Sequence, residues 1–410
     1  MWLYRWWYYM VFIGATALFL LHYLIVGQAV YGDGIGYYAH LHSWVIDADW
    51  DATNEYKHLY QVENNNAMVP LSADTVPIVS SDQDGRALNP YSPVVAVLLL
   101  PFYLLAHLIT QVLNLAGVAI STTGYGDPYQ ILTGLGAICY MIAGVVCLEK
   151  SLLYFGVGRI ERRVITGSLF LGSNLLYYGS VDVINSHFAS FFLICFFLYH
   201  LFNHDESWRK QAVLGFTTGL LTANRPQDGL VLLVWLAYYL LDKKSLSASA
   251  IVVFIFGGLF GVLPLVLHWL QTFSGIANHT YVESMSRDSS FLSSQVLLGS
   301  LVTPWTGLFS TTPLLLAVVV LFIYYRCHLN LKMIGLVAFF ICQYLVISWQ
   351  GGWAAAAYGG RMYISSLPLF AVMMGAFQDK VLTHKAFKYG LFCAILINAV
   401  SIVIFMLRDS

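Results

Sequence analysis

The sequence carries little charge for its length. Lysine, arginine, aspartate and glutamate make up 10% of its 410 residues, whereas hydrophobic residues make up 59%. A soluble globular domain has roughly 25% charged residues, so this composition excludes one and indicates an integral membrane protein. The formal net charge of −1 gives no basis for binding nucleic acid or for a polybasic membrane anchor.

Cysteine is also scarce, and its placement argues against disulfides. The six cysteines lie in apolar runs or at the edge that we predict to be cytoplasmic: Cys139, Cys147, Cys195, Cys327, Cys342 and Cys393. No exported loop holds a pair, so we expect packing roles. The chain lacks internal repeats, low-complexity tracts and a soluble domain. No small-residue cleavage site follows the first apolar run, which we therefore expect to remain as a span.

Hydropathy predicts apolar segments at roughly residues 7–29, 92–115, 129–149, 164–180, 188–203, 211–223, 229–241, 246–271, 312–325, 333–349, 362–377 and 389–407. Arg5 and the basic residues at 150–163 both look cytoplasmic, yet three segments separate them. An odd number of crossings would place them on opposite sides, so one segment is expected not to span. We expect segment 92–115 to be the one that does not span, because it contains Pro101 and ends in polar residues.

The charges then divide between the two sides. One side receives 14 of the 20 lysines and arginines but only 6 of the 21 acidic residues. The opposite side keeps six cations: Lys57, Arg86, Arg225, Arg287, Arg361 and Arg408. The positive-inside rule therefore predicts eleven crossings, with the N-terminus in the cytoplasm and the C-terminus outside.

The first external loop, residues 30–91, opens with the stretch from Tyr31 to Tyr38, in which Asp33 follows the first span directly. A carboxylate at the depth of the headgroups is costly enough to suggest a function. Tyr37, Tyr38 and other apolar residues fall on one arc of a helix that places His40 and His42 on the other arc, which predicts a helix lying in the membrane surface. The acidic run that follows, from Asp47 to Glu55, looks too polar for a core.

A second polar feature is the tip at residues 224–228. From Lys210 to Asn224 is only 14 residues, or about 21 Å of helix, against a hydrocarbon core of about 30 Å. We therefore expect the tip to dip below the outer surface and line a cavity, because lipid would not tolerate it.

Five short motifs give the chain a resemblance to the GT-C superfamily, which comprises polytopic glycosyltransferases that use polyprenyl-phosphate sugars, and within it to uncharacterised bacterial members related to dolichyl-phosphate-mannose-protein mannosyltransferases. The motifs are Gly32-Asp33-Gly34-Ile35-Gly36-Tyr37-Tyr38, Leu88-Asn89-Pro90-Tyr91-Ser92, Arg225-Pro226-Gln227-Asp228, Gly307-Leu308-Phe309-Ser310-Thr311-Thr312-Pro313 and Tyr358-Gly359-Gly360-Arg361. The resemblance runs from residue 1 to about residue 375 and is carried by the order of the motifs. It implies an N-terminal transmembrane module, taken here as residues 1–271, with interfacial helices in the first external loop, and a C-terminal module at 272–410.

The resemblance also implies that an acidic residue of the first external loop is the catalytic base, and Asp33 is the matching position. Several relatives have two adjacent acids there, whereas Gly34 follows here. A base would activate an acceptor hydroxyl, and arginines would stabilise the leaving phosphate. We rank Arg361 first for the phosphate, Arg225 second and Arg86 third, and expect a single displacement with inversion at the anomeric carbon.

Further candidates for contact with substrate or acceptor are Tyr37, Tyr38, Asp182, His187 and Asp228. Asp49 and Asp51 have a spacing that could hold Mg²⁺ or Mn²⁺, although no cofactor is firmly required. Each role has a structural alternative. Asp33 could cap the interfacial helix, Arg361 could extend toward lipid headgroups, and Arg225 could simply pair with Asp228.

The sequence thus predicts an all-helical membrane protein, and the resemblance implies a glycosyltransferase of the bacterial cytoplasmic (inner) membrane, active in cell-envelope glycan biosynthesis. Its site would face the periplasm and transfer a sugar from a polyprenyl-phosphate donor to a lipid, glycan or protein acceptor. Two alternatives stay open: a glycan polymerase or ligase that uses a diphosphate-linked donor, and a lipid or solute transporter without enzymatic activity.

Overall fold

The computed structural model describes residues 6–66, 86–203, 207–241, 246–272, 294–327, 329, 331–350, 353, 358–383 and 385–409, and every regular element among them is helical. The elements up to residue 272 are α1 (Trp7–Val26), α2 (Gly34–His42), the π-helical turn η1 (Ser43–Asp47), α3 (Thr53–Asn66), α4 (Val94–Leu115), α5 (Asp127–Ser151), η2 (Leu152–Phe155), α6 (Arg159–Leu171), α7 (Leu175–Tyr178), α8 (Ser186–Leu201), α9 (Trp208–Asn224), η3 (Pro226–Val231), α10 (Leu232–Leu241) and α11 (Ala248–Thr272). The later elements are α13 (Ser294–Val302), α14 (Pro313–Tyr324), α15 (Leu331–Gln350), η6 (Arg361–Ser366), α16 (Leu367–Ala376), α17 (Gln378–Thr383) and α18 (Lys385–Asp409).

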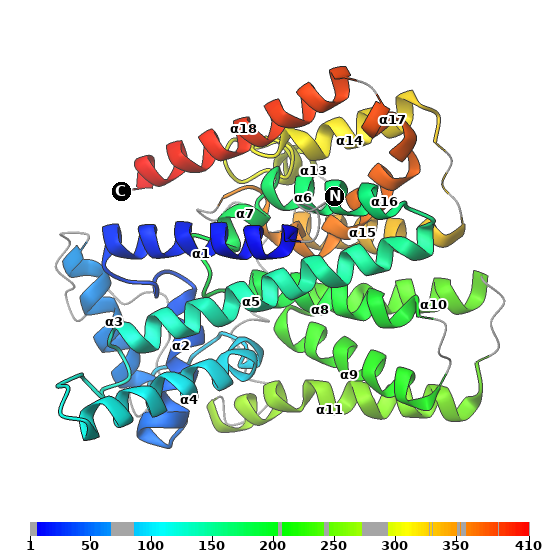
Figure 1. Ribbon diagram of the computed structural model, residues 1–410. Helices are drawn as coiled ribbons and strands as arrows, with labels where there is room; N and C mark the ends of the chain where they lie inside the picture. Colours follow the sequence, from blue (N-terminus) through cyan, green and yellow to red (C-terminus); the bar gives the residue numbers. More distant parts are fainter. Residues whose placement is uncertain are drawn as a thin grey trace.

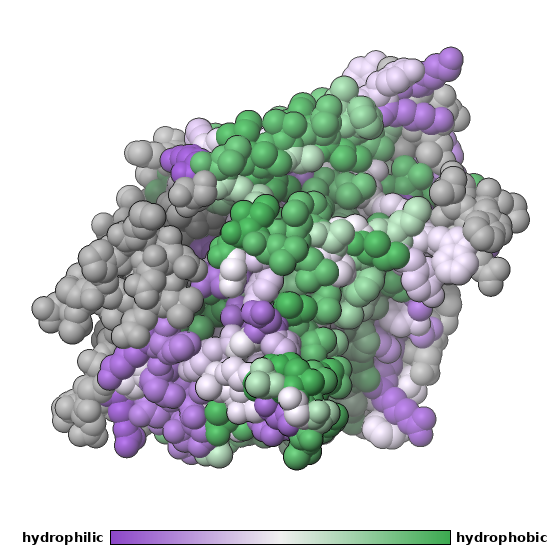
Figure 2. All heavy atoms as spheres, turned by 60° about the vertical axis from the view of Figure 1, so that its left-hand side comes forward, coloured by the Kyte–Doolittle hydropathy of each residue, from purple (hydrophilic) through white to green (hydrophobic). Residues whose placement is uncertain are grey.

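The long helices run broadly alongside one another, and α2 and α3 stand across them at one end (Figure 1). Six described helical segments are long and apolar enough to cross a membrane: Trp7–Val26, Val94–Leu115, Asp127–Phe155, Ala248–Thr272, Leu331–Gln350 and Phe387–Arg408. Hydrophobic side chains form a broad band between more hydrophilic ends (Figure 2). The chain is therefore an all-α, membrane-embedded protein, as its composition predicts.

The finer topology remains a prediction. Eleven crossings require segment 92–115 not to span, yet α4 is among the six helices with sufficient length and hydropathy. Several other predicted spans are helices of 10–17 residues, including Ser186–Leu201, Pro226–Leu241 and Pro313–Tyr324. The division at residue 272 also remains a prediction, and one continuous hydrophobic core contains residues from Val11 to Ala394.

Most predicted apolar segments coincide with helices to within a few residues, as α1, α5, α11 and α18 show. Segment 164–180 is the exception, because the helix breaks between α6 and α7. There the Ser173 hydroxyl donates to the Leu169 carbonyl, 2.6 Å away, and the Asn174 amide donates to the carbonyl of Gly359. Back-bonding by serine of this kind often bends a helix, and Asn174 instead bonds to a distant segment of backbone.

Two of the cations predicted to share one side, Lys210 and Lys332, lie near the same aromatic cluster at one end of the bundle. Lys332 Nζ, at the start of α15, lies 3.3 Å from the carbonyl of Tyr154 in η2. The Tyr154 ring packs within 5.9 Å of Tyr238, over which Lys210 Nζ lies at 5.1 Å. Asp127, at the opposite end of α5, accepts a 2.7 Å hydrogen bond from Tyr23 near the end of α1, just before the Asp33 loop. Arg5, Lys243, Lys244 and Arg287 lie outside the described residues.

The exposed polar face predicted for the helix after Asp33 is wrong, because all nine residues of α2 are buried within the protein. The helix lies across the long helices at one end of the bundle (Figure 1), and its place at the membrane surface stays a prediction. Its polar side chains find partners in distant segments: His40 Nε2 lies 3.0 Å from the Tyr91 carbonyl, and His42 Nε2 lies 2.8 Å from the Thr123 carbonyl. Glu55, which looks too polar for a core, is 0% exposed. Hydrogen bonding makes this burial tolerable.

Glycines allow α9 and α11 to pack backbone to backbone. A Cβ atom added at Gly219 would lie 2.2 Å from the Gly258 carbonyl oxygen, and one at Gly261 would lie 2.3 Å from the Phe216 carbonyl oxygen. Small residues permit such close approach between helices in a membrane. This contact fixes the path of α9, and therefore the position of Arg225 directly after it.

We predict that Gly261→Ala lowers thermal stability, because the new methyl group must push α11 away from α9; overpacking of this kind costs about 1–3 kcal/mol. The matched control is Gly14→Ala in α1, where a Cβ meets nothing within 4 Å. Thermal melts in detergent should show a lower midpoint for the first variant only. Equal midpoints would show that the α9–α11 contact is not tight.

Candidate functional site

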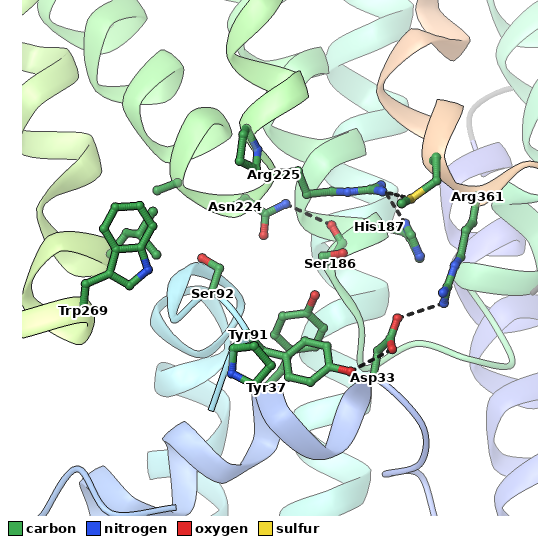
Figure 3. A pocket seen from close by; sticks show the side chains of 15 residues that line it. Asp33, Tyr37, Tyr91, Ser92, Ser186, His187, Asn224, Arg225, Trp269 and Arg361 are labelled. Carbon is green, nitrogen blue, oxygen red and sulfur yellow. Dashed lines mark hydrogen bonds and ion pairs between the residues drawn. The ribbon is translucent and has the colours of Figure 1, made fainter. Parts of the chain in front are cut away.

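A half-open pocket of about 190 Å³ lies where several helices end. Figure 3 shows its polar side chains pointing toward one another from separate elements. The lining residues are Asp33, Tyr37, Pro90, Tyr91, Ser92, Ser186, His187, Ala223, Asn224, Arg225, Pro226, Leu265, Trp269, Arg361 and Met362. The predicted tip at 224–228 thus contributes to a cavity, as its short preceding helix suggests.

Asp33 occupies the N-cap position of α2, but its side chain makes no capping hydrogen bond. Its carboxylate instead faces the pocket, where Oδ1 accepts a hydrogen bond from the Tyr91 hydroxyl at 3.0 Å and Oδ2 accepts one from Arg361 Nη1 at 2.9 Å. The side chain is 38% exposed. Burial raises the pKa of Tyr91 far above its usual range, so the phenol stays protonated as a donor. The capping alternative therefore does not describe this aspartate.

Arg361 begins η6 directly after two glycines with left-handed backbone, Gly359 at φ 65° and Gly360 at φ 57°. The Gly359 amide donates to the Trp305 carbonyl at 2.7 Å, and the Gly360 amide donates to the Thr306 carbonyl at 3.0 Å. A Cβ at Gly360 would lie 2.7 Å from the backbone of Leu308, so only glycine fits without movement. The Tyr358-to-Arg361 motif is thus held against the segment that contains the Gly307 motif.

This turn aims the Arg361 side chain inward, where it is only 18% exposed and paired with Asp33. An arginine that extends toward lipid headgroups would be open to the outside, so that alternative does not describe Arg361.

Arg225 follows α9 in an extended conformation. Its Nη1 lies 3.2 Å from His187 Nδ1, and its Nη2 contacts the sulfur of Met362. Because a guanidinium only donates, Nδ1 of His187 must be the accepting nitrogen. The side-chain amide of Gln227 lies 3.2 Å from Nη2. These contacts hold the guanidinium on the wall that also carries Arg361.

Asp228 does not line the pocket. It is fully buried behind Arg225, and its carboxylate accepts hydrogen bonds from Ser190 at 2.5 Å, Ser365 at 2.7 Å and Gln343 at 2.8 Å. Arg225 and Asp228, both within the described chain, form no direct ion pair. The simple turn-closing pair considered from the sequence is therefore absent, and Asp228 joins α8, α15 and η6 beneath the pocket.

Asp182 lies in the loop before α8, close enough to the site to feel its charges. Burial raises the pKa of its carboxyl to about 7, even though the positive charge of Arg361 and a hydrogen bond from Asn185 oppose that rise. The negative charge of Asp33 adds to the upward shift. Two carboxylates therefore share the field of one arginine, and only Asp33 bonds to it directly.

Two more predicted positions, Tyr38 and Arg86, lie elsewhere. The Tyr38 hydroxyl donates to the carbonyl of Gly124 at 2.6 Å, so this residue is a buried packing residue, whereas Tyr37 does line the pocket. Arg86 has a side chain that is 67% exposed and 3.9 Å from Asp51, outside the pocket.

The carboxylates of Asp49 and Asp51 each bond to the backbone of their own loop, and cation binding by this pair stays a prediction. Oδ1 of Asp49 accepts from the Asp51 backbone amide, and Oδ1 of Asp51 accepts from the Thr53 amide at 3.0 Å, as in short turns. All six cysteines are free, which agrees with the packing role predicted for them.

The pocket also contains residues that the sequence argument did not select. Tyr91 belongs to the Leu88-to-Ser92 motif, which was the feature of the sequence that could have indicated it. Its neighbour Asn89 in that motif donates to the Gly36 carbonyl at 2.9 Å. Trp269 reaches the pocket from α11, and Ser186 and Asn224 reach it from helix ends. Asn224 Nδ2 donates to the Ser186 carbonyl at 3.1 Å. Nothing in the sequence around Trp269 distinguishes it from other interfacial tryptophans.

Comparisons with protein-family models, with curated proteins and with solved structures found no match to this chain. Its fold and pocket alone therefore define its class: a helical, membrane-embedded protein whose charged pocket lies at the end of the bundle opposite the Lys332 and Tyr154 contact.

We predict that Asp182 makes the protein less stable as pH rises from about 4 to about 7. The folded protein still holds the proton in this range, whereas the unfolded chain, with a pKa near 3.8, has released it. Asp182→Asn removes this contribution, so its melting temperature should fall less between pH 5 and pH 8 than that of the wild type. Exposed Asp49→Asn is the control and should follow the wild type. Parallel curves for Asp182→Asn and the wild type would refute the shift.

Proposed function

We propose that the protein is a glycosyltransferase that moves a sugar from a polyprenyl-phosphate donor to an acceptor hydroxyl at the external face of a bacterial cytoplasmic membrane. One observation carries the proposal: Asp33, Arg361 and Arg225, from three separate parts of the chain, line a single pocket. A carboxylate next to two guanidinium groups suits a reaction that removes a proton and releases a phosphate.

In the proposed reaction, Asp33 takes the proton of the acceptor hydroxyl as its oxygen attacks the anomeric carbon. The bond from that carbon to the phosphate oxygen breaks, and its electron pair leaves with the polyprenyl phosphate. Because this is a single displacement from the opposite face, the product has inverted anomeric configuration. Tyr91 donates to Oδ1 and so helps to fix the carboxylate, while Tyr37, Leu265 and Trp269 supply less polar walls for the sugar or the first isoprene units.

The ion pair between Asp33 and Arg361 has a consequence for this mechanism. While Arg361 Nη1 donates to Asp33 Oδ2 at 2.9 Å, that carboxylate oxygen is occupied and is less available to take a proton from an acceptor. A donor phosphate competes with Asp33 for the guanidinium. Donor binding would therefore draw Arg361 toward the phosphate and free Asp33 Oδ2 to accept a proton, which couples proton removal to the presence of donor.

Arg225 supplies the second positive group. Its partners His187 and Met362 are uncharged in this arrangement, and Met362 is the next residue after Arg361. The two guanidiniums therefore flank one short piece of η6. Arginine is well suited to hold a phosphate between two such groups, because its planar fork donates in fixed directions and keeps its charge.

We predict that Asp33→Asn lowers the turnover number for transfer from a polyprenyl-phosphate sugar by about 10²–10⁴-fold, the range typical of a lost general base. Purified wild type and variant would be assayed with a panel of polyprenyl-phosphate sugars, and the anomeric configuration of the product determined. Asp49→Asn, which alters an exposed acid outside the pocket, should keep wild-type turnover.

Two results would contradict this assignment. Equal turnover by wild type and Asp33→Asn would remove Asp33 as the base, and a product with retained configuration would exclude the single displacement. If no donor is turned over but the protein moves lipid or solute across vesicles, the transporter alternative is favoured. Activity only with a diphosphate-linked donor would favour the polymerase or ligase alternative.

The proposed competition for Arg361 makes a separate binding prediction. Asp33→Asn should bind polyprenyl phosphate more tightly than the wild type, because the carboxylate no longer competes for the guanidinium. Arg361→Gln should bind it about 10-fold to 100-fold more weakly, in line with the loss of a charge-assisted hydrogen bond. Titration of fluorescent polyprenyl phosphate into detergent-solubilised protein measures both. Weakened binding by both variants would show that Asp33 supports phosphate binding and does not oppose it.

A further inference from the structure

A second cluster of polar side chains lies at the other end of α2 from Asp33, outside the pocket. His42, the last residue of α2, faces Asp47 of η1 and Glu55 of α3. Its Nδ1 atom lies 3.1 Å from Asp47 Oδ2 and 3.0 Å from Glu55 Oε1, and one ligand atom from each residue lies within 4.8 Å of the others. His42 and Glu55 are buried, whereas the Asp47 side chain is 28% exposed.

The hydrogen bonds of His42 fix the role of one of its two ring nitrogens. Nε2 lies 2.8 Å from the Thr123 carbonyl, and a carbonyl only accepts, so Nε2 carries hydrogen. In the neutral imidazole, Nδ1 then presents a lone pair toward two carboxylate oxygens. A lone pair facing two anions is unfavourable, so this position calls for a positive group between the three ligand atoms, either a proton on Nδ1 or a bound cation.

Glu55 supplies an independent indication of a missing partner. Its side chain is completely buried, yet Oε2 has no hydrogen-bond partner. The nearby Ser43 hydroxyl lies 2.7 Å from Glu55 Oε1 and 2.8 Å from the Ala39 carbonyl, but it has one hydrogen to give. A buried carboxylate with so few donors is costly, and a bound cation would offset that cost.

We propose that His42 Nδ1, Asp47 and Glu55 bind a divalent transition-metal ion, with Zn²⁺ the best fit and Mn²⁺ the next. One imidazole and two carboxylates are a donor set that both ions accept, and a water completes a tetrahedral zinc site. Two ligands about 2.0–2.1 Å from a tetrahedral zinc lie roughly 3.3 Å apart. The separations of Nδ1 from the two carboxylate oxygens, 3.1 and 3.0 Å, are close to that spacing.

The surrounding groups have the arrangement that orients metal ligands. The Thr123 carbonyl holds the far nitrogen of His42, Asn54 Nδ2 donates to Asp47 Oδ2 at 2.9 Å, and Ser43 lies against Glu55. Such outer contacts fix the tautomer of a ligating histidine and the direction of ligating carboxylates. The partial exposure of Asp47 leaves a path by which the ion can enter.

The metal would have a structural role. It would join the end of α2 to η1 and to α3, while His42 ties the same point to the loop that precedes α5. Because Asp33 stands at the other end of this nine-residue helix, the ion would help to set its orientation without touching the pocket.

The test is metal content and stability of the full-length protein, purified in detergent with any affinity tag removed. After chelation, dialysis against Zn²⁺ and washing, the wild type should retain one zinc per chain, and zinc should raise its melting temperature in a way that a chelator reverses. Glu55→Gln, which keeps the side-chain shape, should bind zinc at least about tenfold more weakly and lose the thermal response. Asp49→Asn, in the same loop, should behave as the wild type.

Replacement of zinc by Co²⁺ provides a readout that depends on direct ligation. Visible absorption bands of the bound cobalt should be present in the wild type and Asp49→Asn but lost in Glu55→Gln. A folded wild type that retains neither zinc nor manganese would overturn the proposal and assign the cluster to a doubly protonated His42 paired with two carboxylates. Zinc binding by Glu55→Gln equal to that of the wild type would overturn it as well.

Discussion

The ion pair between Asp33 and Arg361 is the contact on which the architecture of the pocket depends, because it joins two groups 328 residues apart in the chain. Each partner is fixed from behind. Asp33 stands at the start of a helix whose histidines bond to the Tyr91 and Thr123 carbonyls, and Arg361 follows a glycine turn bonded to residues 305 and 306. A charge pair held this rigidly loses little side-chain entropy on forming, unlike an exposed one.

The remaining wall depends on packing between helices. Glycines bring α9 and α11 into backbone contact, and α9 ends at Asn224, directly before Arg225. Arg225 is thereby placed inside the protein, beside His187 and Met362. The same short helix that suggests a buried polar tip in the sequence also explains why Asn224 and Arg225 can line a cavity that α11 closes with Leu265 and Trp269.

Hydropathy was enough to predict the helices, because an apolar run long enough for the bilayer leaves the backbone little choice but to form one. Asp33, Arg225 and Arg361 were predictable because charged residues are rare and each stands beside a helix boundary. The burial of α2 could not be predicted from the sequence. Its pattern of apolar and polar arcs fits a surface helix, and only partners around residues 89–91 and 123 make buried His40 and His42 acceptable. Arg86 was misplaced for the same reason, since its distance from the pocket depends on tertiary contacts.

The charges around the pocket show why Asp182 matters to a site that would receive an anion. Asp33 and Arg361 offset each other, and Arg225 is offset by Asp228 beneath it, whose carboxylate is held by three donors. The protonation of Asp182 then sets the net charge around the pocket, because its pKa of about 7 leaves it partly protonated near neutral pH. When it is protonated, the two arginines face an incoming phosphate without a surplus carboxylate. When it is ionised, the site is one charge more negative and disfavours the same phosphate, so anion binding and protonation of Asp182 must favour each other.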